Sequence, residues 1–301
     1  GRALVLRRPP TGAVLATAHD MGREHRIISA LAGSGVPVPP AIGLCKDDDV
    51  NGAPFYVMDF VNGAVLDTPA MVRQTLPDPA SRRRLSESVL EALVALHSLD
   101  PDAVGLGDLG RKQAYLDRQL SRWRTQWEKT KTRELASMDE TYTLLQRAKP
   151  EQKYTGIVHG DYRLGNMLAT PDGRVAAVLD WELCTLGDPL ADVGYLMNDW
   201  NGPGDLSPNA SGTGISATSC GGFPSRDALL ARYEASTGIS TAKIAYYRAF
   251  QYWRLAAIVE GVLSRYMKGV MAEGGNVEAF RSQIDALASA ALELASSDAL
   301  R

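Results

Sequence analysis

The chain has 301 residues, of which 45% are hydrophobic and 22% charged, and its formal net charge is −3 at pH 7. These values are typical of a globular protein with one large domain or two smaller ones. The small net charge provides no general attraction to nucleic acid or to an anionic membrane, so we expect neither as a partner. No run of about 18 apolar residues occurs, and hence no transmembrane helix is expected.

The cysteines indicate a reducing compartment. Cys45, Cys184 and Cys220 are odd in number, far apart and without CxxC spacing, which argues against disulfides and structural zinc. The N-terminus does not resemble a signal peptide, because Arg7 and Arg8 follow only four apolar residues. We therefore expect a cytoplasmic protein.

The first sixty residues predict a strand, a helix and a hairpin of two further strands. The predicted elements are a strand at residues 3–7, a helix at about 18–32, strands at 41–46 and 55–60, and a polar turn at 47–52. Alternation of apolar residues, turn chemistry and a helical apolar stripe carry these predictions.

After a short link at residues 61–63 the pattern becomes mainly helical. Helices are predicted at 78–97, 112–131, 242–268 and 278–295, strands at 166–169 and 175–179, and a Gly/Ser/Pro-rich loop at 201–225. The first of these helices has a clear start, because Asp78 is a good cap and Pro79 suits the first helical position. We predict a small lobe at residues 1–62 and a larger lobe at residues 63–301.

Three short polar side chains follow strand-like segments in the middle of the chain. Asp161 and Asn166 are five residues apart, and Asp180 comes fourteen residues after Asn166, at the end of an apolar run. Phosphoryl transfer from a magnesium-bound nucleotide needs a carboxylate beside the attacking hydroxyl, and an amide and a second carboxylate that hold the metal. The spacing therefore predicts an ATP-dependent phosphotransferase that uses Mg²⁺.

Asp161 is the predicted catalytic carboxylate, which accepts the proton of an acceptor hydroxyl or only orients it toward the γ-phosphorus. Arg163 is the second catalytic candidate, because a guanidinium offers a fork of donors to phosphate oxygens; a solvated surface arginine is the equal alternative. His159 is interpreted as a support of the loop and not as a general base. Asp188 and Asp192 are interpreted as structural residues that cap a helix or brace the loop.

Asn166 and Asp180 are the predicted metal ligands. The amide oxygen of Asn166 can bind Mg²⁺ while its NH₂ group braces Asp161. A carboxylate at the end of the buried strand 175–179 is costly unless it is paired or bound to metal, which favours the ligand role of Asp180. Glu182 is a weaker candidate for the same cleft.

Arg7 and Glu24 are predicted to hold the nucleotide phosphates, as a strand cation paired with a helix carboxylate. Arg7, or its neighbour Arg8, would stand where kinases usually have lysine; arginine is bulkier but competent to bind phosphate. A surface ion pair that contributes little is the alternative.

The strand 55–60 runs into the link, whose backbone would hydrogen-bond the adenine edge of a nucleotide. Met58, Asp59 and Val61 are the residues predicted to line that slot. An apolar strand that contributes only to the core is the alternative.

Together these residues resemble the aminoglycoside phosphotransferase and choline kinase-like family. The signature consists of His159-Gly160-Asp161, Asn166, and Asp180 followed by Trp181-Glu182. The resemblance covers most of the chain and implies an α+β, protein-kinase-like fold with two lobes: a small N-terminal antiparallel sheet with one helix, and a larger, mainly helical C-terminal lobe. It also implies a nucleoside triphosphate and a small hydroxylated acceptor as the binding partners. The absence of a DFG motif argues against a protein kinase.

In detail the chain is similar to the branch of this family that is found beside, or fused to, acyl-CoA dehydrogenases. The run Leu6-Arg7-Arg8-Pro9-Pro10, the pair Arg23-Glu24 and the segment 159–163 carry this similarity. It implies a hydroxylated acyl compound or another metabolic intermediate as acceptor. Residues 241–301 have six acidic and seven basic side chains, a balance that fits a neutral, anionic or partly apolar acceptor better than a polycation. Ordinary helix packing with surface arginines explains the same balance equally well.

Two other functions stay open at this point. A pseudokinase would keep the fold as a binding or regulatory module, although the intact trio of Asp161, Asn166 and Asp180 favours an enzyme. A true aminoglycoside-resistance kinase is the other alternative. The glycine-rich segment that covers nucleotide phosphates in such enzymes is expected ahead of the strand 3–7; without it this form of the chain would bind nucleotide poorly.

Overall fold

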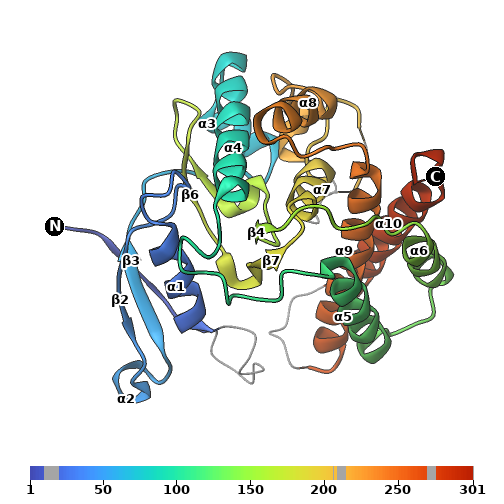
Figure 1. The fold of residues 1–301 in the computed structure, drawn as a ribbon, viewed down its shortest axis with the longest axis horizontal. Coiled ribbons are helices and arrows are strands. Elements are labelled where there is room, and N and C mark those ends of the chain that lie inside the picture. Colours follow the sequence, from blue (N-terminus) through green and yellow to red (C-terminus); the bar gives the residue numbers. More distant parts are fainter. Residues whose placement is uncertain (10–19, 206, 209–214, 270–275, 301) are drawn as a thin grey trace.

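A small antiparallel sheet with one helix lies beside a larger, mainly helical part (Figure 1). The computed structural model describes residues 1–9, 20–205, 207–208, 215–269 and 276–300. This arrangement confirms the α+β, protein-kinase-like fold that the sequence predicted. We call the elements up to residue 62 the small lobe and the rest the large lobe; that boundary itself stays a prediction.

The small lobe is a three-stranded sheet covered by one helix. Its strands are β1 (Leu4–Arg7), β2 (Ala41–Cys45) and β3 (Phe55–Asp59), in the order β1-β3-β2 with both pairs antiparallel. Helix α1 (Met21–Leu31) starts at Asp20, whose side chain accepts a hydrogen bond from the Arg23 amide. Its apolar stripe is buried, as the periodicity indicated. The predicted beginning of this helix near residue 18 lies outside the described residues.

The connection between β2 and β3 differs from the simple polar turn that we predicted. It contains a helical turn, α2 (Asp48–Asn51), which Asp47 caps through the Asp49 amide. Gly52 ends it in the left-handed region at φ 72°, a conformation that glycine adopts without steric cost. Consecutive Asp and Asn residues favour such capped turns. The alternation of apolar residues, from which the hairpin was predicted, carries no information about them.

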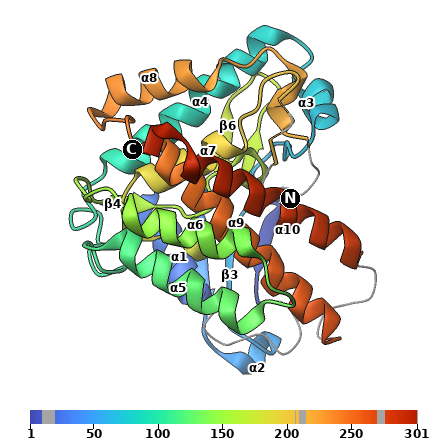
Figure 2. The same cartoon turned by 90° about the vertical axis from the view of Figure 1, so that its right-hand side faces the viewer.

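The large lobe consists of eight helices in the described residues, together with two short two-stranded sheets. The helices are α3 (Pro69–Thr75), α4 (Pro79–Ser98), α5 (Tyr115–Thr130), α6 (Ala136–Arg147), α7 (Leu190–Asn198), α8 (Arg226–Thr237), α9 (Ile244–Met267) and α10 (Val277–Ser296). Helices α5, α6, α9 and α10 pack against one another on the side of the molecule that faces the viewer in Figure 2. The predicted positions of α4, α5, α9 and α10 are confirmed to within a few residues, whereas α3, α6 and α8 had no prediction of their own.

Helix α9 is buried on most of its circumference, since it packs against α5, α6, α7 and α10. Its aromatic residues Tyr246, Tyr247, Phe250 and Trp253 are almost fully enclosed. Large aromatic side chains bury much apolar surface, and this explains why they are so frequent in a helix that is enclosed on most sides. In the part of the chain that is described, no helix is long and apolar enough to cross a membrane.

The two short sheets contain the strands that flank the predicted site residues. Strand β4 (Gly156–Val158) pairs with β7 (Thr185–Gly187), and β5 (Met167–Ala169) pairs with β6 (Val175–Val178), both antiparallel. The β5–β6 hairpin was predicted, and the pairing of β4 with β7 was not. Two backbone hydrogen bonds join Ala64 of the link to Ala169, and the Val178 amide donates to the Pro37 carbonyl over 2.8 Å. The small lobe is therefore attached directly to the hairpin that ends at the predicted metal ligands.

Candidate active site

The loop after β4 is supported by a buried histidine. The His159 ring accepts a hydrogen bond from the Asp161 amide over 3.2 Å, and its Nε2 lies 2.9 Å from the Leu179 carbonyl oxygen. The ring also packs against Tyr162 and Trp181. These contacts confirm that His159 supports the loop, and they connect the residue before Asp180 to the loop that contains Asp161.

Gly160 allows the loop to lie close to the backbone of Leu183. Its φ is 86°, and an added Cβ would lie 2.8 Å from the Leu183 carbonyl oxygen. A larger residue would push residues 181–183, the short helical turn after Asp180, away from the loop. The His-Gly-Asp motif therefore brings two parts of the candidate site together through its first two residues.

Asp161 and Asn166 are in direct contact. The Asn166 Nδ2 atom donates to the Asp161 Oδ2 atom over 2.7 Å and to the Asp161 carbonyl over 2.9 Å. The Asp161 side chain is 23% exposed, so one side of the carboxylate stays open to a substrate. This geometry leaves the Asn166 amide oxygen facing away from Asp161, where it is available to a metal ion.

Asp180 directly follows the β5–β6 hairpin, and the Leu179 amide donates to the Asn166 carbonyl over 2.8 Å. Its backbone is in the left-handed region, with φ 64°. Its Oδ1 atom is buried without a hydrogen-bond partner. A buried carboxylate oxygen without a hydrogen-bond donor fits a hard divalent cation such as Mg²⁺. Among the described residues no three His, Cys, Asp or Glu side chains are grouped in a way that could hold a metal ion, and the metal-ligand roles of Asn166 and Asp180 stay a prediction.

Asp192 at the start of α7 holds the loop after β4 in place through its carboxylate. Its Oδ2 and Oδ1 atoms accept hydrogen bonds from the His159 and Gly160 amides over 2.7 and 2.8 Å. His97 Nε2 lies 3.3 Å from Oδ2, and the other ring nitrogen of His97 is 2.8 Å from the Tyr233 hydroxyl. The predicted role of Asp192 as a brace of the loop is confirmed.

We expect the substitution Asp192→Asn to lower the free energy of unfolding by about 2–4 kcal/mol. The side chain is fully buried, and an asparagine would point an NH₂ group at one of two backbone amides that now donate to a carboxylate. Urea unfolding followed by tryptophan fluorescence measures the change. Asp139→Asn, which removes only a surface ion pair with Arg124, is the control and should change the stability by less than about 1 kcal/mol.

Asp188 is buried at the N-terminus of α7, where it was predicted to act as a cap. Its Oδ1 atom accepts from the Leu190 amide over 3.0 Å and its Oδ2 atom from the Tyr247 hydroxyl over 2.7 Å. Burial raises the pKa of the Asp188 carboxyl above its ordinary value, and the two hydrogen bonds only partly offset this effect. The helix begins one residue later than predicted, at Leu190, but the capping contact is confirmed.

The raised pKa has a consequence for stability. The folded state favours the protonated form, so this group contributes stability below the unfolded pKa and loses it as the pH rises through the folded pKa. Asp188→Asn is therefore expected to increase the Tm relative to wild type at pH 7 and to have a smaller effect at pH 4. Thermal unfolding of both proteins at the two pH values measures this. The prediction is wrong if the Tm gain of the variant over wild type is smaller at pH 7 than at pH 4.

Arg7 and Glu24 form the ion pair that we predicted between β1 and α1. The Arg7 Nε atom lies 3.4 Å from Glu24 Oε2, and the Tyr56 hydroxyl donates to the same oxygen over 3.2 Å. Arg7 Nη2 is also 3.7 Å from both Asp180 Oδ1 and Glu182 Oε2. The structure therefore brings the candidate phosphate-binding cation next to the candidate metal ligand. Its neighbour Arg8 instead donates to Asn51.

Arg163 lies beside Asp161, but its guanidinium has another partner. Nη1 is 3.0 Å from Asp67 Oδ1, and Nε is 3.9 Å from Asp161 Oδ1. Gly165 makes room for this pair, because an added Cβ would lie 2.1 Å from the Asp67 oxygen. Asp67 had no prediction from sequence; it comes from the segment after the link, which only the fold places here.

Tyr195 is a second residue that the sequence did not indicate. Burial and the negative charge of the nearby Asp161 carboxylate raise the pKa of the Tyr195 hydroxyl well above its ordinary value. Tyr195 is one helical turn after Asp192 on α7, so both face the loop. The i, i+3 spacing of these two residues is the signal that could have identified it.

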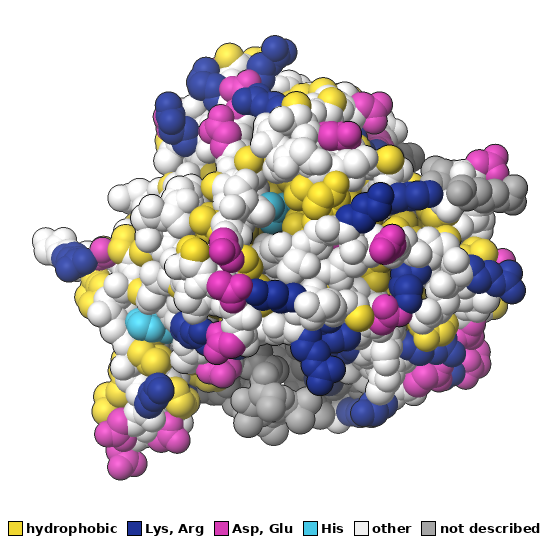
Figure 3. Space-filling view, viewed as in Figure 1, with side chains coloured by type: hydrophobic (Ala, Val, Ile, Leu, Met, Phe, Trp, Pro, Cys, Tyr) yellow, Lys and Arg dark blue, Asp and Glu magenta, His cyan; other side chains and the backbone are white. Residues whose placement is uncertain are grey.

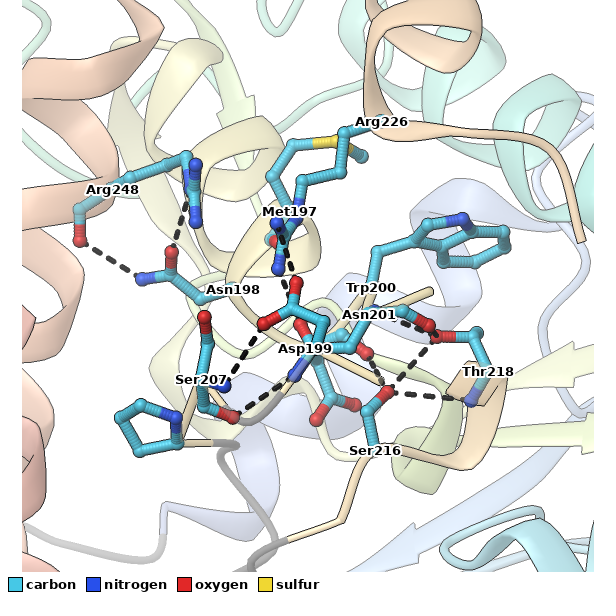
Figure 4. A network of polar contacts seen from close by, with 12 residues as sticks. Met197, Asn198, Asp199, Trp200, Asn201, Ser207, Ser216, Thr218, Arg226 and Arg248 are labelled. Carbon is cyan, nitrogen blue, oxygen red and sulfur yellow. Dashed lines mark hydrogen bonds and ion pairs between the residues drawn. The ribbon is translucent and has the colours of Figure 1, made fainter. Parts of the chain in front are cut away.

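Polar contacts at the end of α7 hold the following segment close to this site. Figure 4 shows that hydrogen bonds connect Thr218 to both Asn201 and Ser216, and that the Ser216 hydroxyl also donates to the Asp199 carbonyl. The Arg226 guanidinium donates to the Met197 carbonyl and to the Asn201 side chain. The described part of the predicted loop at 201–225 therefore makes specific hydrogen bonds near the end of α7. It also contains a short helical turn at Ala217–Cys220.

The residues predicted to line the adenine slot make their contacts within the small lobe. Met58 is partly buried in β3, opposite Val5 of β1. The Asp59 carboxylate binds the Arg2 guanidinium at 2.7 Å, and its amide donates to the Pro40 carbonyl over 2.9 Å. No described contact joins Met58, Asp59 or Val61 to the cluster around Arg7, so the role of these three residues stays a prediction.

A cavity of about 580 Å³ opens next to the catalytic loop, between α1, α5 and α9. Gly160, Glu182 and Leu183 form one of its walls. Arg23 of α1 ties that wall to the small lobe by donating to the Glu182 and Cys184 carbonyls. Its volume is in the range that small-molecule sites occupy.

The model of a protein family described as "Phosphotransferase enzyme family" matches residues 1–236. The chain belongs to this family. Mouse acyl-CoA dehydrogenase family member 10 is 36% identical over 270 residues, which are 89% of the chain and 25% of that protein. The chain therefore spans about a quarter of the length of this relative. The resemblance to the branch associated with acyl-CoA dehydrogenases is confirmed.

Solved structures agree with this family assignment. A crystal structure from Ralstonia eutropha JMP134, provisionally named an aminoglycoside phosphotransferase, has 34% identity and a TM-score of 0.79, covering 97% of the chain and 85% of that protein. A more distant phosphotransferase, solved as a ternary complex with AMP-PNP and hygromycin B, has 17% identity and a TM-score of 0.58 over 96% of the chain and 87% of its own. The second likeness shows the fold alone.

Proposed function

We propose that this phosphotransferase moves the γ-phosphate of ATP to a hydroxyl group of a small molecule. The observation that carries the proposal is the contact between Asn166 and Asp161, 2.7 Å long, in a loop that is joined to Asp180 through His159 and Leu179. Two carboxylates and an amide so arranged suit phosphoryl transfer from a metal-bound nucleotide. The presence of AMP-PNP in a protein of the same fold supports nucleotide as the donor.

In this proposal Asp161 orients the acceptor hydroxyl and takes its proton. The hydroxyl oxygen forms a bond to the γ-phosphorus while the bond between that phosphorus and the β,γ-bridging oxygen breaks, so that ADP leaves. Asn166 and Asp180 would hold Mg²⁺, which supplies positive charge against the triphosphate. Arg7, which pairs with Glu24, would bind the nucleotide phosphates, and Arg163, which lies beside Asp161, would contact the transferred group.

A hydroxylated acyl compound or a related metabolite is the acceptor class that we propose. The similarity to a protein named as an acyl-CoA dehydrogenase family member supports this class. Free cysteines and the use of ATP are consistent with a cytoplasmic location, which is part of the same proposal.

The test has two steps. Isothermal titration with ATP should give heat that depends on Mg²⁺. Labelled γ-phosphate should then be transferred to at least one compound in a panel of hydroxylated metabolites that includes hydroxyacyl thioesters. Metal-independent or absent binding of ATP would refute the proposal; ATP binding without transfer to any acceptor would favour a pseudokinase.

A true aminoglycoside kinase is less well supported. A neighbour with this fold is solved with hygromycin B, but the cavity beside the catalytic loop has four arginines in its lining, and an aminoglycoside is a polycation. Expression of the chain in a susceptible bacterium should leave the minimum inhibitory concentration of aminoglycosides unchanged.

A further inference from the structure

The cavity next to the catalytic loop has an excess of unpaired positive charge. Its basic lining residues are Arg23, Arg122, Arg254 and Arg265, and its acidic ones are Asp20, Glu24 and Glu182. The acids already have partners, since Asp20 caps α1 and the two glutamates pair with Arg7. The Arg23 guanidinium donates its hydrogen bonds to backbone carbonyls. Among the described residues no carboxylate pairs with the other three arginines.

Arg254 is the most unusual of these residues. It lies in the middle of α9 and is only 5% exposed. Its Nη1 atom donates to the Gln251 side chain over 2.8 Å, and its Nε atom is buried without a hydrogen-bond partner. Its guanidinium stands over the rings of Trp123 and Tyr195, at 5.3 and 5.8 Å from their centroids. A neutral amide and two aromatic faces do not compensate a buried charge in the way that a carboxylate would.

A second arginine adds to this charge. Arg122 of α5 stands over the same Trp123 ring, at 5.2 Å from the centroid. Partial burial of its guanidinium and the nearby positive charge of Arg254 both lower the pKa of Arg122. Two like charges that approach each other destabilise the folded protein, so their retention in one cavity indicates that an anion completes the site.

The position of Arg254 links this charge to the catalytic carboxylate. The Arg254 guanidinium stands over the Tyr195 ring, and the negative charge of Asp161 acts on the hydroxyl of the same tyrosine. Tyr195 is therefore a common neighbour of Arg254 and Asp161. Gly160, the residue before Asp161, lines the cavity together with Arg254.

Resting on the proposed function, we infer that the acceptor is an anion whose carboxylate or phosphate group binds Arg254 and Arg122 while its hydroxyl lies at Asp161. A guanidinium offers paired donors to the oxygens of either group. The tyrosine between the two ends sets their separation, so the hydroxyl and the anionic group are several bonds apart in the acceptor.

The inference is tested by phosphate transfer to matched acceptors. Hydroxycarboxylic acids of four to eight carbons are compared with their primary amides, which have the same shape without the charge. The wild-type kcat/KM should be about 10–100-fold higher for the acid, as expected for charge-assisted hydrogen bonds. The coenzyme A thioester and the neutral N-acetylcysteamine thioester of the same acids show whether a phosphate can replace the carboxylate.

Two variants locate the anion. Arg122→Gln and Arg254→Met should each reduce the ratio of acid to amide about tenfold, with the KM for ATP unchanged. Arg232→Gln removes an arginine that pairs with Glu87 on α4, and it should keep the wild-type ratio. Because the Arg254 charge is uncompensated, Arg254→Met should retain or raise the Tm, which a purely structural arginine would not do.

The inference is wrong if wild type treats acid and amide alike, or if both variants keep the wild-type ratio. A failure of the proposed function has a different signature, namely no phosphate transfer to any acceptor. In that case inorganic phosphate is the probe: a rise in wild-type Tm with phosphate that Arg122→Gln and Arg254→Met abolish supports the anion site, and no rise overturns it.

Discussion

The substitution Asp161→Asn is expected to reduce kcat about 10²–10⁴-fold, the range typical for loss of a positioned acid–base group. Asparagine keeps the size of the side chain. The Asn166 amide, which donates to the Asp161 carboxylate over 2.7 Å in the wild-type protein, can still donate to the oxygen of the new side chain. The amide cannot accept the proton of the acceptor hydroxyl. Binding of Mg-ATP should change little, because Asp161 contacts the acceptor in the proposed mechanism and not the nucleotide.

Steady-state phosphate transfer measures the effect, and isothermal titration checks that the nucleotide still binds. Asp172→Asn is a suitable control, because that side chain is exposed in the turn between β5 and β6; it should retain wild-type kcat. Wild-type rates for Asp161→Asn would mean that the chemistry lies elsewhere, or that the biological role of the chain is a binding function.

The substitution Asp180→Asn should lower kcat/KM for Mg-ATP by about 10²–10³-fold, similar to the loss of other groups that stabilise developing charge. The Oδ1 atom of Asp180 is buried without a donor and is 3.7 Å from the Arg7 guanidinium. An amide would keep the shape but remove the charge that attracts the metal. Asparagine also tolerates the left-handed backbone at φ 64°, so the fold should remain intact.

The concentration of Mg²⁺ that gives half-maximal activity separates the metal-ligand role from a purely structural one. It should rise in Asp180→Asn while the Tm in the absence of nucleotide stays close to wild type, because a partly exposed pair with Arg7 contributes little stability. Glu182→Gln is the matched comparison, since it lies at the same 3.7 Å distance from Arg7. If both variants keep wild-type Mg²⁺ dependence, neither carboxylate holds the metal.

Local sequence was sufficient for much of the fold. The cap at Asp78, the turn between β5 and β6, and the long apolar stripes depend on residues close together in the chain, and their positions were predicted to within a few residues. Strand β7, helix α3 and helix α6 had no such signal. Strand β7 is three residues long and exists because β4 is available as a partner, a contact that local propensity does not contain.

The candidate site divides in the same way. The sequence by itself was enough to predict the chemistry that we propose, because the spacing of Asp161, Asn166 and Asp180 is a property of one loop and one hairpin, which few other functions require. Only the tertiary structure decided which distant residues complete the site. Asp67 is 96 residues from its partner Arg163. Tyr195 is 34 residues from Asp161, and Arg254 is 91 residues from Arg163. Their roles depend on packing between helices and lobes, and such contacts follow from the burial of side chains in three dimensions and not from their order in the chain.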